Sequence, residues 1–364
     1  MKLINPSLLQ QIEYYLSNFE HPTLQRSLGE LEALQHCEWR QKTLQIVLKL
    51  PFVWRRGLQD LQQVSQSSWK ISSVDEPINW RLLTFVATLK PANGQPLIPN
   101  IRNLIAVHSA KGGVGKSSIA VNLALALAAE GGRVGLFDAD IYGPSIPTML
   151  GTLGQKPHIQ QQHMQPIEAH GIVMNSIGYL LTDRQAPLWR GPMASRAVEQ
   201  LLRETLWPEL DYLVIDMPPG TGDIPLTLAQ KLPITAVIGI TTPQQVAISD
   251  TQHGFHLWRH LNIPVLGIVE NMSHYYCPHC NQQEMIFGSG GGQKLAEGYQ
   301  IPLLGQLPLQ PLVQQHLDQG IPTVIAQPQS PLADWFYHLA DQVAALLYWQ
   351  GEPVGDMINI RMCD

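Results

Sequence analysis

Short hydrophobic runs recur along most of the chain, and their spacing predicts secondary structure. Residues 104–107, 134–137, 212–215, 236–240 and 265–269 are apolar throughout, as the buried strands of a parallel sheet are. The runs alternate with helical stretches. This order predicts an α/β fold in which a mostly parallel, doubly wound sheet is covered by helices on both faces. Ligands of such sheets bind at the carboxyl ends of the strands.

The first ninety residues show a different pattern. Residues 43–50 alternate between apolar and polar side chains, as a half-buried strand does, and a further strand is expected near residues 82–89. One helix is predicted to begin at Pro6 with Asn5 as its cap; its apolar face consists of Leu8, Leu9, Ile12, Tyr15 and Leu16. A second predicted helix carries Leu58, Leu61 and Val64.

These patterns divide the chain into segments. Residues 1–90 are predicted to form a small α+β domain, and residues 91–100 form a linker that is rich in Pro, Gly and Asn. Residues 101–350 carry the alternating strands and helices, and residues 351–364 form a tail. A length of 364 residues fits about two domains.

A glycine-rich loop separates the first buried strand from a helix that ends at Gly131-Gly132. Such a loop, between a strand and a helix, is typical of a phosphate-binding loop, because glycine lets backbone N–H groups approach the phosphates. Lys116 is placed to reach the β- and γ-phosphates, and the Ser117 hydroxyl to bind Mg²⁺. The predicted nucleotide-binding residues here are Ala110, Lys111, Gly112, Gly113, Val114, Gly115, Lys116, Ser117 and Ser118.

Acidic residues follow two of the predicted strands. Asp138 and Asp140 follow one strand, and Asp216 and Asp223 follow another. Because a buried carboxylate is costly unless it meets a cation or water, we assign Asp216 to the Mg²⁺ site with Ser117. We assign Asp140 to orienting the attacking water. An alternative remains open, chiefly for Asp138 and Asp223: each simply caps the helix that follows it.

Composition narrows the class of function. The chain has 23 basic and 29 acidic residues, which argues against a general nucleic-acid binder. It contains no apolar run long enough to span a bilayer, and its start does not resemble a signal peptide; the expected location is the cytoplasm. Two of its four cysteines form Cys277-Pro278-His279-Cys280, a pairing typical of metal or redox sites.

The motifs together resemble the Mrp/ApbC iron-sulfur cluster carrier ATPases over roughly residues 100–350. The resemblance rests on the loop with its additional Lys111, on the Cys277 to Cys280 string, and on residues 138–145, 189–193 and 216–223. It implies ATP, Mg²⁺ and a [4Fe-4S] cluster as ligands. Residues 1–90 resemble the small domain that often precedes the ATPase in bacterial members, except that His21-Pro22-Thr23 stands where that domain usually has Asp-Pro-Glu.

The resemblance also implies roles for single residues. Lys111 would reach the partner subunit's phosphates across a homodimer interface, so that Lys111, Lys116 and Asp140 form the catalytic set. Asn271 is similar to the family's adenine-contacting residue. The implied partners are a second copy of the chain, apo iron-sulfur proteins and a cluster assembly scaffold, with neither nucleic acid nor membrane.

Two cysteines of one chain cannot supply the four ligands of a cluster or of a structural zinc site. A two-fold dimer brings two pairs together, so Cys277 and Cys280 are expected to hold a bridging [4Fe-4S] cluster. Three alternatives stay open: a zinc site completed by His274 or His279, a dithiol redox centre, or an inert pair. The isolated Cys37 and Cys363 are expected to be ordinary thiols.

A rival function is a MinD/ParA-like partitioning switch, which belongs to the same group of ATPases. Its membrane anchor would be the helically spaced apolar residues between Leu332 and Leu347. Anchors of this kind carry Lys or Arg for anionic lipid, and none occurs between Lys294 and Arg361. We therefore expect this helix to pack onto the sheet.

Overall fold

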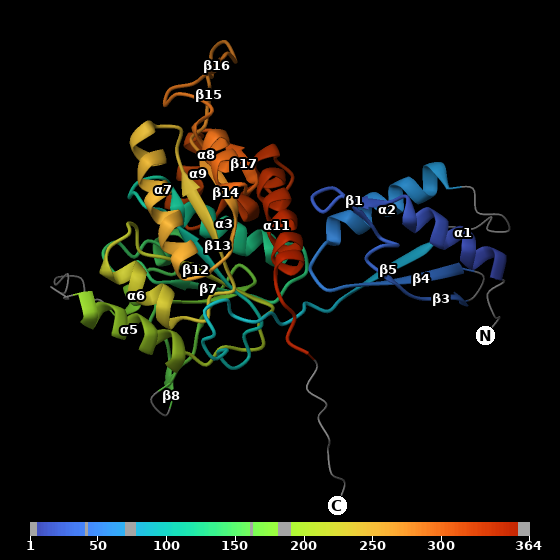
Figure 1. Cartoon of the computed structure of the whole chain (residues 1–364), viewed down its shortest axis with the longest axis horizontal. Helices are drawn as coiled ribbons and strands as arrows, with labels where there is room; N and C mark the ends of the chain where they lie inside the picture. Colours follow the sequence, from blue (N-terminus) through green and yellow to red (C-terminus); the bar gives the residue numbers. More distant parts are fainter. Residues whose placement is uncertain (1–5, 41–42, 70–77, 161–162, 181–190, 356–364) are drawn as a thin grey trace, which may run out of the picture.

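A computed structural model of the chain describes residues 6–40, 43–69, 78–160, 163–180 and 191–355. The described residues form a large unit built on an eight-stranded sheet and a smaller unit built on a three-stranded sheet, which lies beside helix α11 of the large unit (Figure 1). Asn5 and Cys363 fall outside the described residues.

The eight-stranded sheet has the order β10-β11-β7-β12-β6-β13-β14-β17, and only the β10–β11 pair at one edge is antiparallel. Strand β6, which precedes the glycine-rich loop, lies in the interior of the sheet with β12 and β13 as neighbours. The strands are β6 (Leu104–His108), β7 (Val134–Asp138), β10 (Ile167–Ala169), β11 (Ile172–Ser176), β12 (Tyr212–Asp216), β13 (Ala236–Thr241), β14 (Val265–Asn271) and β17 (Leu303–Leu307).

Helices cover both faces of this sheet, which explains why its strands are apolar throughout. Along β6, Ile105 and Val107 pack with α3 and α11, whereas Leu104 and Ala106 pack with α5 to α8 on the other face. The helices are α3 (Lys116–Ala129), α4 (Ile146–Met149), α5 (Gly191–Glu204), α6 (Asp223–Lys231), α7 (Gln245–His260), α8 (Gly291–Tyr299), α9 (Pro311–Asp318), α10 (Thr323–Ala326) and α11 (Pro331–Gln350), with a 3₁₀ turn at Ile177–Tyr179. The expected fold class is confirmed.

The smaller unit places two helices on one face of its sheet (Figure 1). In this sheet β3 is antiparallel to β4, and β4 is parallel to β5 because α2 forms the crossover between them. Its elements are α1 (Pro6–Ser17), β3 (Leu34–Arg40), β4 (Thr43–Leu50), α2 (Arg55–Ser68) and β5 (Asn79–Thr84). Three two-stranded ladders complete the described structure: β1 (Glu20–His21) with β2 (Arg26–Ser27), β8 (Ile159–Gln160) with β9 (His163–Met164), and β15 (Tyr275–Tyr276) with β16 (Gln283–Glu284).

The strand expected at residues 82–89 was misplaced. The strand is β5 (Asn79–Thr84), and the chain then leaves the sheet. Val86 and Leu89 are buried in the core outside this sheet. Their apolar pattern therefore reflects burial in the core and not membership of a strand. The alternation at residues 43–50 is confirmed, with Leu44, Ile46, Leu48 and Leu50 buried. The domain limits at residues 90, 100 and 350 stay predictions.

Arg56 of α2 connects the two units. Its backbone N–H donates to Glu130, the residue after α3, at 2.9 Å, and its guanidinium donates to Asp334 of α11 at 2.8 Å. The guanidinium also lies 4.1 Å from the ring centroid of Tyr337. Glu130 is only 2% exposed, and burial raises its pKa. The smaller unit thus holds the far end of the helix that begins at the glycine-rich loop.

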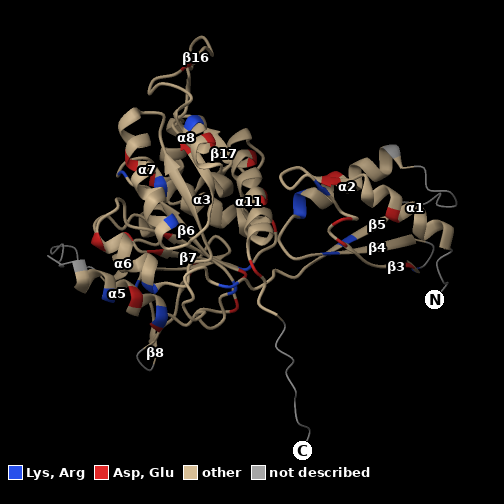
Figure 2. Cartoon of the chain, viewed as in Figure 1, with Lys and Arg blue, Asp and Glu red and all other residues tan. Residues whose placement is uncertain are grey.

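Helix α11 packs as expected and has neither Lys nor Arg (Figure 2). Its apolar residues Phe336, Leu339, Val343 and Leu347 are buried, and its main neighbour is α3. None of the helices in the described part of the chain has both the length and the apolar composition that crossing a bilayer requires.

Asp341 of α11 generates a testable pH dependence. Burial, and then the negative charge of Glu130, raise its pKa to about 8, and its Oδ1 atom has no hydrogen-bond partner among the described residues. The pKa of Asp341 is higher in the folded state than in the unfolded state, so folding is favoured at low pH, where the carboxyl is protonated in both states. The free energy of unfolding falls as the pH rises from about 4 to about 8. Replacing Asp341 by Asn removes this loss.

We therefore expect Asp341→Asn to be more stable than the wild type at pH 8.5 by about 1 kcal/mol or more, roughly 2–4 °C in melting temperature. The gain at pH 5.5 should be smaller, as calorimetry at the two pH values would measure. Asp318→Asn removes an exposed carboxylate as a control. A gain for Asp341→Asn that is equal at both pH values would contradict the raised pKa.

Candidate functional site

The glycine-rich loop folds into an open turn between β6 and α3. Gly113 and Gly115 have φ values of +80° and +83°, a conformation that residues with a side chain rarely adopt. A Cβ atom at Gly112 or Gly113 would meet nothing within 4 Å, so the backbone at these positions is open to a ligand. Ala110 and Ser118 flank this turn, and Lys116 begins α3.

Lys116 points back from the first turn of α3 to the carboxyl ends of neighbouring strands. Its Nζ atom lies 2.5 Å from Asp216 Oδ1 and 3.5 Å from Asp140 Oδ2. The Ser117 hydroxyl donates to Asp216 Oδ2 at 2.6 Å. The structure thus brings together Lys116, Ser117, Asp140 and Asp216, which the sequence predicted to act at one site.

The cluster carries an excess of buried negative charge. Asp138 and Asp216 are fully buried and Asp140 is 8% exposed, whereas Lys116 is the cation that faces them. Burial, and then the charge of Asp216, raise the pKa of Asp138 to about 7. Burial also raises the pKa of Asp216, against the opposing effect of Lys116. Each carboxylate therefore favours a second cation nearby.

The oxygen atoms at this position fit Mg²⁺. Asp140 Oδ1 is buried and has no hydrogen-bond partner among the described residues, and the Ser117 hydroxyl lies 2.6 Å from Asp216 Oδ2 and 3.4 Å from Lys116 Nζ. Carboxylate and hydroxyl oxygens are the ligands that Mg²⁺ takes in phosphate sites. The donor set is therefore of the right chemistry for the metal that the sequence predicted here.

Asp138 acts as a support within this cluster. It accepts hydrogen bonds from the backbone N–H of Asp140 at 3.1 Å, from the N–H of Ile146 at 3.3 Å, and from the Ser176 hydroxyl at 2.9 Å. The contact with Ile146, the first residue of α4, is the capping role that the sequence left open. Asp223 is instead the first residue of α6, with Gly222 at the N-cap position.

Asn271 and Lys111 approach the glycine-rich loop in different ways. The Asn271 side chain donates to the Val114 carbonyl at 2.8 Å, and its oxygen accepts from the Met272 N–H at 2.9 Å. Lys111 is half-buried and forms no ion pair with any described residue. Asn271 is therefore part of the loop's surroundings, and the Lys111 ammonium is available to an external anion.

Cys277 and Cys280 lie on the β15–β16 hairpin, which projects beyond the helices of the large unit (Figure 1). Cys280 is exposed and Cys277 partly exposed. Hydrogen bonds from the backbone N–H groups of Cys280 and His279 lower the pKa of the Cys277 thiol. A lowered pKa favours the thiolate, which is the form that binds metals.

The hairpin holds two sulfur ligands and no complete metal site within one chain. Among the described residues, no group of three or more His, Cys, Asp and Glu side chains is arranged to hold a metal ion. His274 is directed to the Ser273 hydroxyl, 2.7 Å from its Nδ1 atom. Within the described part of the chain, the hairpin thus supplies two sulfur ligands, fewer than the four of a structural zinc site or a [4Fe-4S] cluster.

A second glycine run, at residues 288–292, is arranged differently from the phosphate loop. It leads into α8, and Glu270 Oε2 accepts a hydrogen bond from the Gly292 N–H at 2.6 Å. A Cβ atom at Gly292 would lie 2.8 Å from the same oxygen. The start of α8 is thus occupied by a carboxylate of this chain, which links β14 to the segment after the cysteine hairpin.

Comparison with known proteins identifies the family. The model of the family described as "NUBPL iron-transfer P-loop NTPase" matches residues 100–344. The chain belongs to this family. Three similar proteins are each named "Iron-sulfur cluster carrier protein". The Escherichia coli K12 protein is 54% identical over 95% of this chain and 94% of its own length; the Haemophilus influenzae protein is 50% identical over 96% and 95%; the Deinococcus radiodurans protein is 41% identical over 87% and 89%.

Two solved structures are also similar to this member of the family. A nucleotide-binding protein from Archaeoglobus fulgidus in complex with ADP has a TM-score of 0.57 and 33% identity, covering 66% of this chain and 92% of its own. The cell division ATPase MinD from Pyrococcus furiosus has a TM-score of 0.52 and 21% identity, covering 67% and 99%. The second similarity concerns the fold alone. The resemblance inferred from the motifs is confirmed by the family and the named relatives.

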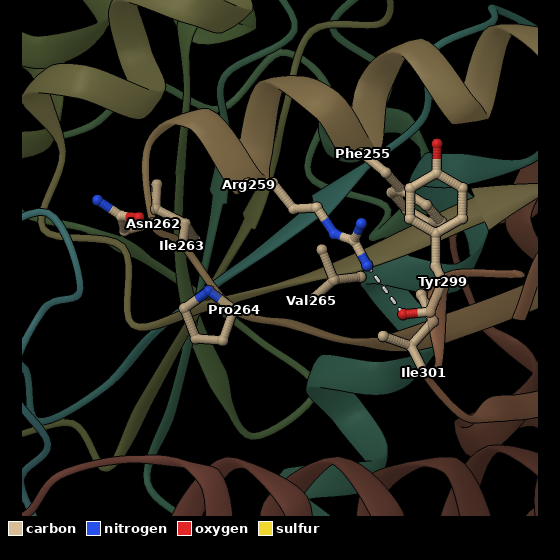
Figure 3. A pocket seen from close by; sticks show the side chains of 8 residues that line it. All are labelled: Phe255, Arg259, Asn262, Ile263, Pro264, Val265, Tyr299 and Ile301. Atoms are coloured by element: carbon tan, nitrogen blue, oxygen red, sulfur yellow. Dashed lines mark hydrogen bonds between the residues drawn. The ribbon is translucent and has the colours of Figure 1, made fainter.

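A pocket of about 310 Å³ lies away from the glycine-rich loop (Figure 3). It opens where α7 ends and β14 begins, so it lies at the amino ends of the strands, opposite to the carboxyl ends that carry the cluster around Lys116. Its Arg259 donates to the Tyr299 carbonyl at 2.9 Å and lies 4.6 Å from the centroid of the Tyr299 ring. The pocket's cation is thus already engaged, and the pocket shares no residue with the cluster around Lys116.

Sequence reasoning missed several residues that support the site. Ser176 donates a hydrogen bond to Asp138, and Glu270 accepts one from the start of α8. His108 is the last residue of the strand before the loop. Only His108 had a usable signal, since a histidine at the end of an apolar strand is unusual. Residues 189 and 190 of the predicted Trp-Arg motif lie outside the described residues.

The cysteine environments generate a prediction about thiol reactivity. Burial, and then the charge of Glu13, raise the pKa of Cys37, whereas the pKa of Cys277 is lowered. In metal-free protein at pH 7, we expect iodoacetamide to alkylate Cys277 several-fold faster than Cys37, as peptide mass spectrometry would measure. The two rates should converge in guanidinium chloride. Equal rates in the folded protein would contradict the assigned environments.

Proposed function

We propose that this chain is an ATPase that carries a [4Fe-4S] cluster and transfers it to apo-proteins. The observation that supports this most is the exposed cysteine pair on a chain that is 54% identical, over almost its whole length, to a protein named as an iron-sulfur cluster carrier. The phosphate loop and the buried carboxylates supply the chemistry for the ATPase part. We place the protein in the cytoplasm.

In the proposed ATP site, the backbone of residues 110–118 surrounds the phosphates, and the amide of Asn271 contacts the adenine. The bound phosphates pair with the Lys116 ammonium in place of Asp216, which is its partner in the structure. Ser117 and Asp216 would hold Mg²⁺, which would supply charge neutralisation at the phosphates. Asp140, which Asp138 holds by its backbone N–H, orients the attacking water.

Lys111 is proposed to complete the site of a second chain. Its ammonium has no ion-pair partner among the described residues, and a cation supplied in trans stabilises the charge of phosphoryl transfer. Hydrolysis then requires two chains, so ATP turnover and dimer formation are coupled.

The cluster is the cargo of the proposed carrier. Each hairpin offers two exposed or partly exposed sulfur atoms, and two chains together provide the four thiolates that a [4Fe-4S] cluster takes. The exposure of the hairpin leaves the cluster accessible to an acceptor. The proposed partners are a second copy of the chain, an assembly scaffold that loads the cluster, and apo iron-sulfur proteins that receive it.

Two alternatives were considered. A partitioning switch would need a surface for membrane or DNA, and α11, the candidate anchor, packs against α3 and has neither Lys nor Arg. A zinc-binding ATPase would use the same cysteines with a second chain. The two metal functions are separated by the following experiment.

Anaerobic reconstitution with iron and sulfide tests the cluster. We expect the wild type to gain a visible absorption band from a thiolate-bound cluster and Cys277→Ala to lack it. The matched control is Cys37→Ala, which removes a thiol of the smaller unit and should load as the wild type does. Equal cluster content in Cys277→Ala would refute the assignment, and zinc without cluster would favour the second alternative.

Kinetics of Lys111→Ala test the role in trans. We expect the affinity for ATP to change less than about threefold and kcat to fall by about 10³-fold, the range of a removed trans-acting cation. Lys116→Ala should instead abolish nucleotide binding. An unchanged rate in Lys111→Ala would contradict the role in trans, and normal hydrolysis in Lys116→Ala would remove the proposed site.

A further inference from the structure

Strand β6 ends in a buried histidine that none of the roles above uses. His108 is 3% exposed, and its Nε2 atom lies 2.8 Å from the Gly220 carbonyl oxygen. Its Nδ1 atom accepts a hydrogen bond from the Trp258 indole at 3.2 Å, and the two rings meet edge to face with centroids 5.1 Å apart. Both ring nitrogens are therefore engaged.

These contacts fix the protonation of the ring. An indole N–H can only donate, so Nδ1 is the acceptor and Nε2 carries the proton that it donates to Gly220. Burial lowers the pKa of His108 to about 4, which keeps the imidazole neutral near pH 7. A second proton on Nδ1 would oppose the Trp258 N–H, because both groups would then be donors.

His108 and Ser109, at the end of β6 and the start of the glycine-rich loop, bind both backbone polar groups of Gly220. Its carbonyl accepts from His108, and its N–H donates to the Ser109 carbonyl at 2.9 Å. It has a φ of +95° and lies four residues after Asp216, in the segment that leads to α6. A segment that is otherwise partly exposed is thus tied to the residues immediately before the phosphate loop.

The next peptide group takes its orientation from this contact. In a planar trans peptide the C=O of Gly220 and the N–H of Thr221 point in opposite directions. Because the carbonyl points inward to His108, the Thr221 N–H points away from the buried ring. This N–H donates to no other described residue, and a Cβ atom at Gly220 or Gly222 would meet nothing within 4 Å. The backbone donor is therefore open to an anion.

We infer that His108 is a positioning residue for ATP hydrolysis: with Trp258 behind it, it fixes the Gly220–Thr221 peptide so that the N–H meets the terminal phosphate of ATP. The inference rests on the proposed ATPase function. A donor preset in this way stabilises the charge of the transferring phosphoryl group without reorganisation during the reaction. ADP has no terminal γ-phosphate, so its binding does not use this donor.

Two substitutions at His108 test the inference against a purely structural role. His108→Phe keeps a ring against Trp258 and removes both hydrogen bonds, whereas His108→Gln retains a donor for Gly220. We expect His108→Phe to lower kcat by about tenfold or more and to weaken a non-hydrolysable ATP analogue relative to ADP. The ADP affinity should change by less than about twofold. His108→Gln should restore kcat to within about threefold of the wild type.

Phe255→Leu is the control, because its ring packs on Gly239 from the same helix as Trp258 and does not contact Gly220. It should keep the ratio of ATP-analogue affinity to ADP affinity. An unchanged kcat and affinity ratio in His108→Phe would overturn the inference, as would a parallel loss of ADP affinity or a His108→Gln variant no better than His108→Phe. A wild-type protein that does not hydrolyse ATP would instead overturn the proposed function itself.

Discussion

The buried contact between Lys116 and Asp216 is the interaction on which the site depends. One ammonium faces carboxylates that come from the ends of β7 and β12, and it reaches them from the first turn of α3. Removing one partner of a buried ion pair costs about 3–5 kcal/mol, because the other charge is left uncompensated. The pair therefore holds the start of α3 against the strand ends, and in the proposed ATP site a phosphate replaces Asp216 as the partner of Lys116.

The parallel sheet connects this ion pair to other parts of the molecule. Its parallel strands bring the phosphate loop, the acidic residues and Asn271 to their carboxyl ends, and the chain after β14, which ends at Asn271, leads to the cysteine hairpin. Asn271 contacts the loop through the Val114 carbonyl, and the adjacent Glu270 holds the start of α8. At the other end of α3, Glu130 contacts Arg56 of the smaller unit. One helix and one strand thus connect three separate parts of the chain.

The sequence was sufficient for the fold class and for the order of the motifs, because continuous apolar strands and a glycine-rich loop have strong local signals. It located Lys116, Ser117, Asp140 and Asp216 together, since strands of a parallel sheet end at one edge. It left the capping of α4 by Asp138 open as an alternative, and it did not predict that Asp138 also holds Asp140, because hydrogen bonds to backbone N–H groups depend on the path of a loop. It also misplaced β5, where burial against the other unit resembles a strand pattern.

The contacts of His108 and Glu270 also could not be predicted from the sequence, because they join residues separated by 112 and 22 positions, respectively. Neither pairing has a local pattern that a reader of the sequence could follow. Both side chains lie at strand ends, and both hold backbone groups of loops next to the proposed sites. The residues that sequence reasoning missed are thus mainly those that position others.

The central claim is that two chains share one cluster and complete each other's ATP sites. Native mass spectrometry of the anaerobically reconstituted protein tests it most directly, since it measures chains and iron in the same particle. We expect a particle of two chains with a single [4Fe-4S] cluster, which separates into cluster-free monomers when iron is removed. A complete cluster on a single chain, in the presence of ATP and Mg²⁺, would contradict it.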